Sequence, residues 1–241
     1  MTLEIVLFPC RSDNYGFLIH DAKNGETAAI DTPDPVEIAA QCETRGWQLT
    51  EIWNTHWHAD HTGGNVALKR RYKARIRAPH REGAEISGVD IVMSGGDHFE
   101  FAGHRVEVSH TPGHTDEHII YHIPDSKAAF VGDTVFALGC GRLFEGTAEQ
   151  MWESLSKIMA MPDETALYCA HEYTLSNAKF ALTVEADNTA LQEAIKVAKA
   201  KREKNIPTVP TTVAVERAAN PFVTAGSAEE LGRRRKLKDN F

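Results

Sequence analysis

The stretch Thr55-His56-Trp57-His58-Ala59-Asp60-His61 places three histidines and one aspartate within six residues, directly after a strand predicted at 51–54. On a strand, positions 56 and 58 point to the same face, and the loop beyond it can turn positions 60 and 61 towards a second position. Imidazole nitrogens suit zinc and iron, and an added carboxylate suits harder ions. The stretch therefore predicts a metal centre, rather than a polar loop with incidental histidines.

Three further side chains occupy the same kind of place in the sequence. His114, Asp133 and His171 each follow a short apolar segment, and a glycine or alanine stands directly before each of them. Small residues let the backbone turn tightly at a strand end, and strand ends at one edge of a sheet are where α/β scaffolds build sites. Together with the first stretch, these residues suffice for two metal ions. The predicted ligands are His56, His58 and His114 for one ion and Asp60, His61 and His171 for the other, with Asp133 as a bridge.

This ligand set predicts hydrolysis as the reaction class. Two ions about 3.5–4 Å apart can share and activate one water molecule, and a single zinc already lowers the pKa of bound water to about 7. The predicted nucleophile is a hydroxide held between two divalent metal ions, zinc first, with iron or manganese as alternatives that accept the same ligands. Asp60 and Asp133 are the predicted catalytic carboxylates, because Asp133 bridges the ions and Asp60 orients the hydroxide as well as binding metal.

The composition is that of an ordinary soluble globular protein. The chain has 241 residues, of which 42% are hydrophobic and 25% charged, and this length suits one large domain, or one domain with a small appendage. The net charge of −8 disfavours nucleic-acid binding. Four widely spaced cysteines form no CxxC pair, which excludes a disulfide framework and a zinc ribbon.

No sequence signal points to a membrane or to export. No apolar run reaches the roughly 18 residues of a membrane span. The first strand-like segment contains Glu4, has no basic leader and does not suggest a signal peptide. We therefore expect a cytoplasmic protein that binds neither nucleic acid nor membranes, and we expect a monomer.

Hydrophobic periodicity predicts a mixed α/β body up to about residue 170 and a small helical segment after it. Strands are predicted at 3–8, 16–20, 27–30, 51–54, 75–78, 98–101, 105–110, 118–123, 128–131 and 166–169. Helices are predicted at 36–45, 64–72, 148–159, 175–184, 191–204 and 227–238. No strand is predicted after residue 169, where prolines at 207, 210 and 221 separate the helices.

The metal motif, with the later Gly-His, Gly-Asp-Thr and His-Glu-Tyr segments, resembles that of the metallo-β-lactamase superfamily. Further stretches resemble the glyoxalase II (hydroxyacylglutathione hydrolase) family, namely 13–15, 139–147, 171–174, 220–222 and 235–239. The resemblance implies a four-layer αββα metallo-β-lactamase fold with a small C-terminal α-helical domain. It implies a metal-binding catalytic domain at 1–170 and a helical glutathione-binding domain at 171–241.

The activity implied by this resemblance is hydrolysis of the thioester S-D-lactoylglutathione to D-lactate and glutathione, a step of methylglyoxal detoxification. The family's metal ligands fall on the seven positions named above. Its glutathione contacts fall on Arg142, Phe144, Tyr173, Arg235 and Lys238. The family often has Lys where this chain has Arg142, and Tyr where it has Phe144, so the charge is kept at the first position and a hydroxyl is lost at the second.

A basic cluster at the end of the sequence suits this substrate. Residues 233–241 carry five basic side chains and one acidic one, a net charge of +4 on a body of −12. A solvated helix end would explain such a pattern as well. Glutathione is a net anion, however, and Arg235 and Lys238 share a helix face, so both can hold a carboxylate and steer the substrate.

Three other functions compete with this hypothesis. A glutathione persulfide dioxygenase with a single iron shares the fold, but the complete second set of ligands and the helical C-terminal segment argue against it. A lactonase or lactamase is a hydrolase that acts without glutathione, and the basic cluster argues against it. A non-enzymatic metal-binding module is a poor match to ligands present at all seven positions.

Overall fold

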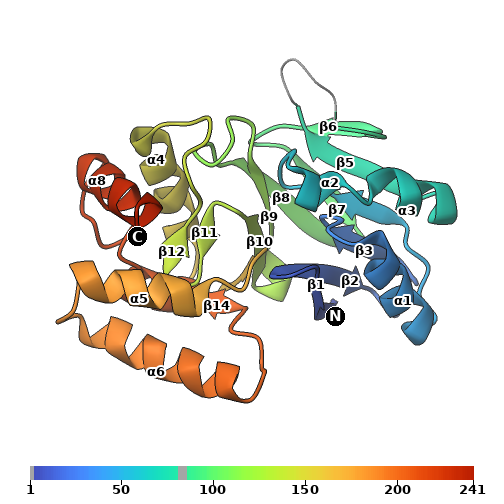
Figure 1. Cartoon of the computed structure of the whole chain (residues 1–241). Coiled ribbons are helices and arrows are strands. Elements are labelled where there is room, and N and C mark those ends of the chain that lie inside the picture. Colours follow the sequence, from blue (N-terminus) through green and yellow to red (C-terminus); the bar gives the residue numbers. More distant parts are fainter. Residues whose placement is uncertain (1–2, 81–85) are drawn as a thin grey trace. The chain divides into compact units, whose positions relative to one another are not determined.

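The chain of this computed structural model, which describes residues 3–80 and 86–241, divides into two units (Figure 1). The first unit comprises Met1–His110 and Glu117–Ser126, and the second comprises Thr111–Asp116 and Lys127–Phe241. Each unit has its own strands, helices and apolar core. None of the helices within the described residues is both long enough and apolar enough to cross a membrane.

The first unit contains a mixed sheet of six strands in the order β1-β2-β3-β4-β5-β6. The pairs β1–β2 and β2–β3 are antiparallel, and the pairs from β3 to β6 are parallel. A second group of strands is antiparallel in the order β7-β8-β9. The elements are β1 (Glu4–Cys10), β2 (Asn14–His20), β3 (Thr27–Ile30), α1 (Pro35–Arg45), β4 (Glu51–Trp53), α2 (Ala59–Thr62), α3 (Asn65–Tyr72), β5 (Arg75–Pro79), β6 (Ile91–Met93), β7 (His98–Phe101), β8 (His104–His110), β9 (Ile119–Ile123) and the 3₁₀ turn η1 (Pro124–Ser126).

Strand β4 leads into the 55–61 loop and is packed on both of its faces. Because successive side chains of a strand alternate, Ile52 lies in the apolar cluster that α1 and α3 form with the sheet, through Ile38 and Leu68. Trp53 points the other way and is 0% exposed, with its ring 5.0 Å from Phe99 in a nearly perpendicular arrangement. The start of the loop is therefore anchored in the core.

The second unit combines three short strand pairs with most of the helices. Strand β10 pairs in parallel with β13, β13 pairs antiparallel with β14, and β11 and β12 form a hairpin. Helices α5 and α6 lie side by side (Figure 1) and share an apolar cluster with Leu138 and Ala219. The elements are β10 (Ala128–Gly132), β11 (Val135–Phe136), β12 (Gly139–Cys140), α4 (Ala148–Met159), β13 (Ala166–Cys169), α5 (Thr174–Val184), α6 (Thr189–Glu203), β14 (Thr211–Thr212), α7 (Val213–Ala219) and α8 (Ala228–Asp239).

Side chains cap the starts of two of the predicted helices, α1 and α4. The side chain of Asp34 accepts from the backbone of Val36 and Glu37 at the start of α1, and Gly46 ends that helix in a left-handed conformation. Thr147 and Gln150 form a reciprocal capping box at the start of α4. The bounds of the predicted strands and helices agree with those of the structure to within a few residues.

The expectation that no strand follows residue 169 was wrong. Thr211 and Thr212 form β14, which pairs with Leu167 and Ala166 of β13. Helix α7 follows at once, with the Thr212 side chain as its N-cap, and the sequence analysis did not predict this helix either. A strand of two residues and a helix of seven carry too little periodicity to be recognised, and both depend on tertiary packing.

Replacing Trp53 tests the packing beneath the 55–61 loop. We expect Trp53→Ala to lower the free energy of unfolding by roughly 3–5 kcal/mol, because it removes a buried ring with three aromatic neighbours. Denaturant unfolding followed by circular dichroism measures this loss. The control is Val36→Ala, at a position 77% exposed, which should change stability by less than about 0.5 kcal/mol. Equal effects of the two variants would contradict this account of the core.

Candidate functional site

Four of the predicted ligands lie together in the first unit, at the end of β4 and in α2. His56 Nε2 lies 3.0 Å from His58 Nδ1, and His61 Nε2 lies 3.5 Å from Asp60 Oδ2. The rings of His56 and His61 have centroids 4.0 Å apart. His56 and His61 are buried, whereas His58 and Asp60 are partly exposed. The first unit therefore offers two pairs of possible ligand atoms, His56 with His58 and Asp60 with His61.

Asp31, which directly follows β3, fixes His61. Its Oδ2 lies 2.8 Å from His61 Nδ1 and accepts from Thr55 Oγ1 at 2.8 Å, and its Oδ1 accepts from Thr55 N at 2.8 Å. A carboxylate of this kind only accepts, so the proton of a neutral His61 lies on Nδ1 and the lone pair lies on Nε2. Asp31 adopts a φ of +57°, a left-handed conformation that Asp tolerates better than most residues.

Other buried polar groups hold the same loop. The carbonyl of His61 accepts from Thr32 N at 2.8 Å and from Asn54 Nδ2 at 3.0 Å. Asn14 Nδ2 donates to Asp60 Oδ2 at 3.1 Å. The fully buried ring of His118 stacks on that of His56 at 4.9 Å. The loop is therefore held in place before any ligand binds.

The other three predicted ligands lie together in the second unit. His114 Nε2 is 3.4 Å from Asp133 Oδ2, and His171 Nε2 is 3.5 Å from Asp133 Oδ1. All three side chains are buried. Asp133 thus presents each carboxylate oxygen to a different histidine, which is the arrangement that a bridging carboxylate requires.

Glycines before two of these residues make the turns that the sequence predicts. Gly132, at the end of β10, has a φ of +47° and directly precedes Asp133. Gly113 has a φ of +143°, and a Cβ built there would lie 2.9 Å from the side chain of Met151. A larger residue at 113 would therefore displace His114 or α4.

Backbone and ring contacts orient His114 and His171. His114 Nδ1 lies 2.9 Å from the carbonyl oxygen of Arg142, so a neutral His114 carries its proton on Nδ1 and its lone pair on Nε2. The Phe144 ring is 5.3 Å from that of His114 and is 61% exposed. Tyr173 stacks on His171 at 4.7 Å with an angle of 3° between the rings. The aromatic residues at 144 and 173 therefore flank the two histidines of this unit.

The predicted glutathione contacts of α8 lie beside Arg142. Arg235 is 4% exposed, donates through Nη1 to the Cys140 carbonyl at 2.8 Å and donates through Nε to Asp239 Oδ1 at 3.1 Å. Arg142 Nε lies 3.6 Å from the same Asp239 oxygen.

Lys238, on the same helix, donates through Nζ to Ser176 O at 3.2 Å. Partial burial, with Arg235 and Arg142 nearby, lowers the pKa of Lys238 to about 8.

Asp31 and Asp239 are the supporting residues that the sequence analysis did not single out. Asp31 follows a buried strand just as Asp133 does, so the signal used for Asp133 applies to it as well. Asp239 stands at the end of a basic helix, and its pairing with Arg235 and Arg142 depends on how α8 packs against residues 140–142.

Two protein families together match residues 24–241. The family described as "Metallo-beta-lactamase superfamily" matches residues 24–171, and "Hydroxyacylglutathione hydrolase C-terminus" matches residues 172–241. A hydroxyacylglutathione hydrolase of Rhizobium meliloti is 49% identical to this chain over 253 residues, which cover 99% of each protein. One of Maricaulis maris is 52% identical over 221 residues, which cover 92% of this chain and 86% of the relative.

Solved structures agree with this relationship at the level of the fold. The crystal structure of ETHE1 from Myxococcus xanthus has a TM-score of 0.73 at 27% identity and covers 98% of this chain and 90% of its own. The BLEG-1 B3 metallo-beta-lactamase has a TM-score of 0.70 at 18% identity, covering 92% of this chain and 100% of its own. This protein therefore has the metallo-β-lactamase fold, followed by the C-terminal helices, and the predicted fold class is confirmed.

Within that superfamily the chain belongs to the hydroxyacylglutathione hydrolase family, and it is a hydrolase. The resemblance inferred from the sequence motifs is confirmed. The superfamily and the clustered His and Asp side chains indicate that the protein binds divalent metal.

Replacing Asp31 by Asn tests how His61 is oriented. In metal-free protein we expect Asp31→Asn to move the His61 proton from Nδ1 to Nε2, because an amide NH₂ at the Oδ2 position donates to Nδ1. A ¹H–¹⁵N multiple-bond spectrum of the imidazole groups distinguishes the two tautomers. Asp34→Asn is the matched control, since Asn caps a helix as well as Asp does. A His61 tautomer unchanged by Asp31→Asn would contradict the proposed role of Asp31.

Proposed function

We propose that this chain hydrolyses the thioester S-D-lactoylglutathione to D-lactate and glutathione. The observation that carries the proposal is the near full-length identity of about half to proteins named hydroxyacylglutathione hydrolase, which includes the C-terminal helices. The basic side chains at 142, 235 and 238 suit an anionic thioester of this kind. We further propose that residues 1–170 form the catalytic part and residues 171–241 the glutathione-binding part.

We propose that this chain binds two divalent metal ions. The donor set supports this number, because each unit supplies two separate groups of ligand atoms and Asp133 offers one oxygen to each. Neutral imidazole with carboxylate suits zinc, and also iron or manganese. The proposed ligands are His56, His58 and His114 for one ion and Asp60, His61 and His171 for the other, with Asp133 shared.

The residues of the chain orient the reaction that such ions support. When bound, divalent ions act as Lewis acids on a carbonyl and lower the pKa of water, which makes hydrolysis feasible near neutral pH. Asp60 accepts from Asn14 through Oδ2 and is proposed to hold the attacking water through its other oxygen. Asp31 and the Arg142 carbonyl keep His61 and His114 in the tautomer that presents Nε2. The leaving thiolate has an ordinary pKa near 8.5 and needs little help from a general acid.

The glutathione moiety is proposed to lie against the second unit. Arg142 and Lys238 supply positive charge for its carboxylates, and Tyr173 and Phe144 supply aromatic surface beside the histidines. The guanidinium of Arg235 donates to Asp239 and to the Cys140 carbonyl. Its proposed contribution to glutathione binding is therefore made from a buried position. We also propose a cytoplasmic location and a monomeric state, with no nucleic-acid or membrane partner.

Turnover of S-D-lactoylglutathione, followed by loss of the thioester absorbance, tests this function. We expect Arg142→Gln to raise KM roughly ten-fold with kcat within about two-fold, because a charge-assisted contact to bound glutathione is lost. Arg142 is 61% exposed in its side chain, so its loss should not unfold the protein. Arg105→Gln, at an exposed arginine of β8, is the matched control. No thioester hydrolysis, with oxygen uptake on glutathione persulfide instead, would contradict the proposal.

The pKa of Lys238 predicts how substrate binding depends on pH. Because this pKa lies at about 8, the ammonium loses most of its charge between pH 7 and pH 9, and KM should rise several-fold over that interval. Lys238→Arg keeps its charge over the same range, so its KM should rise less. Parallel KM profiles of the two proteins, measured between pH 6.5 and pH 9.5, would show that Lys238 does not contact the anionic substrate.

A further inference from the structure

The hairpin formed by β11 and β12 turns at Ala137 and Leu138, in the second unit. Leu138 has a φ of +60°, a left-handed conformation that a residue other than glycine keeps only where its surroundings hold it. Buried backbone groups of a turn also need hydrogen-bond partners. Asn177 Nδ2 of α5 donates to Ala137 O at 3.1 Å, and Asn220 Nδ2, at the end of α7, donates to Gly139 O at 2.8 Å.

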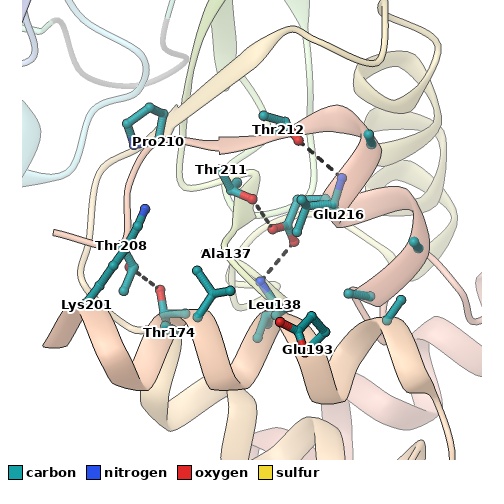
Figure 2. A pocket seen from close by; sticks show the side chains of 18 residues that line it. Ala137, Leu138, Thr174, Glu193, Lys201, Thr208, Pro210, Thr211, Thr212 and Glu216 are labelled. Atoms are coloured by element: carbon teal, nitrogen blue, oxygen red, sulfur yellow. Dashed lines mark hydrogen bonds between the residues drawn. The ribbon is translucent and has the colours of Figure 1, made fainter. Parts of the chain in front are cut away.

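Glu216 of α7 is the acceptor at the centre of this arrangement. The residue is 0% exposed, and its Oε2 accepts from Leu138 N at 2.9 Å and from Asn220 Nδ2 at 2.8 Å. Its Oε1 accepts from Thr211 Oγ1 at 2.7 Å (Figure 2). One carboxyl group therefore holds the N–H of the left-handed residue and also orients the amide that holds the far side of the turn.

The surroundings of Glu216 direct its oxygens to the turn. A cavity of about 470 Å³ borders Glu216 and is lined largely by small aliphatic side chains of α6 and α7, such as Ala194, Val197 and Ala218. The hydroxyls of Thr174 and Thr208 in its wall lie 2.6 Å from each other. Burial raises the pKa of the Glu216 carboxyl to about 7. A buried carboxyl of this kind is stable only with its hydrogen bonds made.

The hairpin contacts His171 and Tyr173 of the second unit through Phe136. The Phe136 ring lies 5.8 Å from that of His171 and 5.3 Å from that of Tyr173, nearly perpendicular to both. Asp133 lies two residues before β11 in the chain. A shift of the turn would therefore move the ring against which His171 and Tyr173 pack.

The strand β12 and the residues after it reach the other contacts of this unit. The Cys140 carbonyl accepts from Arg235, and the Arg142 carbonyl lies against His114 Nδ1. Gly141 N donates at 3.3 Å to the carbonyl oxygen of Thr134, the residue that follows Asp133 in the chain. Between them, β11, β12 and residues 141–142 contact two of the predicted metal ligands and the buried Arg235 of α8.

We propose that Glu216 is a positioning residue of this hydrolase: by holding the turn at Leu138 it fixes the β11–β12 hairpin and, through it, His114, His171, Tyr173 and Arg235. The proposal rests on the proposed thioester hydrolase function. Helix α7 lies outside the metal motif. By this proposal it helps to fix the positions of both the metal ligands and the glutathione contacts.

Two substitutions of Glu216 separate hydrogen bonding from packing. Glu216→Gln keeps one oxygen for Leu138 N and Asn220, and its NH₂ donates to the Thr211 hydroxyl, so kcat and KM should stay within about three-fold of wild type. Glu216→Met keeps the volume and loses the acceptor. We expect kcat/KM for S-D-lactoylglutathione to fall by roughly 10- to 100-fold, the range for residues that support metal ligands, and the metal to be lost faster to a chelator.

The controls distinguish positioning from a general loss of stability. Thr211→Val removes a hydrogen bond to the same carboxyl on the side away from the turn, and it should leave kcat and KM near wild type. Each assay is run well below the unfolding midpoint of its variant, which circular dichroism determines. If Glu216→Met does not fold, Glu216→Asp takes its place, because the shorter side chain keeps the carboxyl group but cannot reach the turn. A folded Glu216→Met or Glu216→Asp protein with wild-type kinetics and metal retention would overturn the proposal, as would equal defects in Thr211→Val.

Two measurements, thioester turnover and metal loss, distinguish failure of this proposal from failure of the proposed function. If wild-type protein does not hydrolyse the thioester, the proposed function fails, and the rate of metal loss to the chelator still compares Glu216→Met with Glu216→Gln. Faster loss in Glu216→Met alone supports the role of Glu216 in holding the ligands. Equal rates of loss in the two variants overturn it.

Discussion

The contact of the Asp133 carboxylate with two histidines is the interaction on which the arrangement of the second unit depends. Its two oxygens lie 3.4 and 3.5 Å from the Nε2 atoms of His114 and His171. Without metal, such a group in a buried position is stable only if its neighbours are fixed around it. The left-handed turn at Gly132 and the hairpin after Asp133 both serve this requirement. The tight turn and buried polar groups here thus follow from the need to hold one carboxylate between two histidines.

The same principle orients the histidines of both units. His61 faces the Asp31 carboxylate through Nδ1, and His114 faces the Arg142 carbonyl through the same ring atom. Both partners only accept hydrogen bonds, so both rings present Nε2 with its lone pair. A histidine whose tautomer is set in advance loses less freedom when it binds an ion. If His61 and His114 bind metal as proposed, Asp31 and the Arg142 carbonyl would therefore contribute to metal affinity through them.

Much of this site could be predicted from the sequence, because its ligands stand directly after short apolar strands. That pattern predicts all seven proposed ligands, and the structure places four of them close together in the first unit and three in the second. Residues that act through tertiary contacts could not be found in this way. Glu216 and Leu138 are 78 positions apart in the chain, and no local pattern links a helix residue to a turn at that distance. The two-residue β14 was missed because its pairing, not its composition, makes it a strand.

The central proposal is that two metal ions share Asp133 and together support hydrolysis. Titration of metal-free protein with Mn²⁺, with the electron paramagnetic resonance spectrum and thioester turnover recorded at each addition, tests it most directly. The account predicts that turnover rises up to two equivalents, together with the signal of an exchange-coupled pair of ions. Full turnover at one equivalent, with only the signal of isolated Mn²⁺, would contradict it.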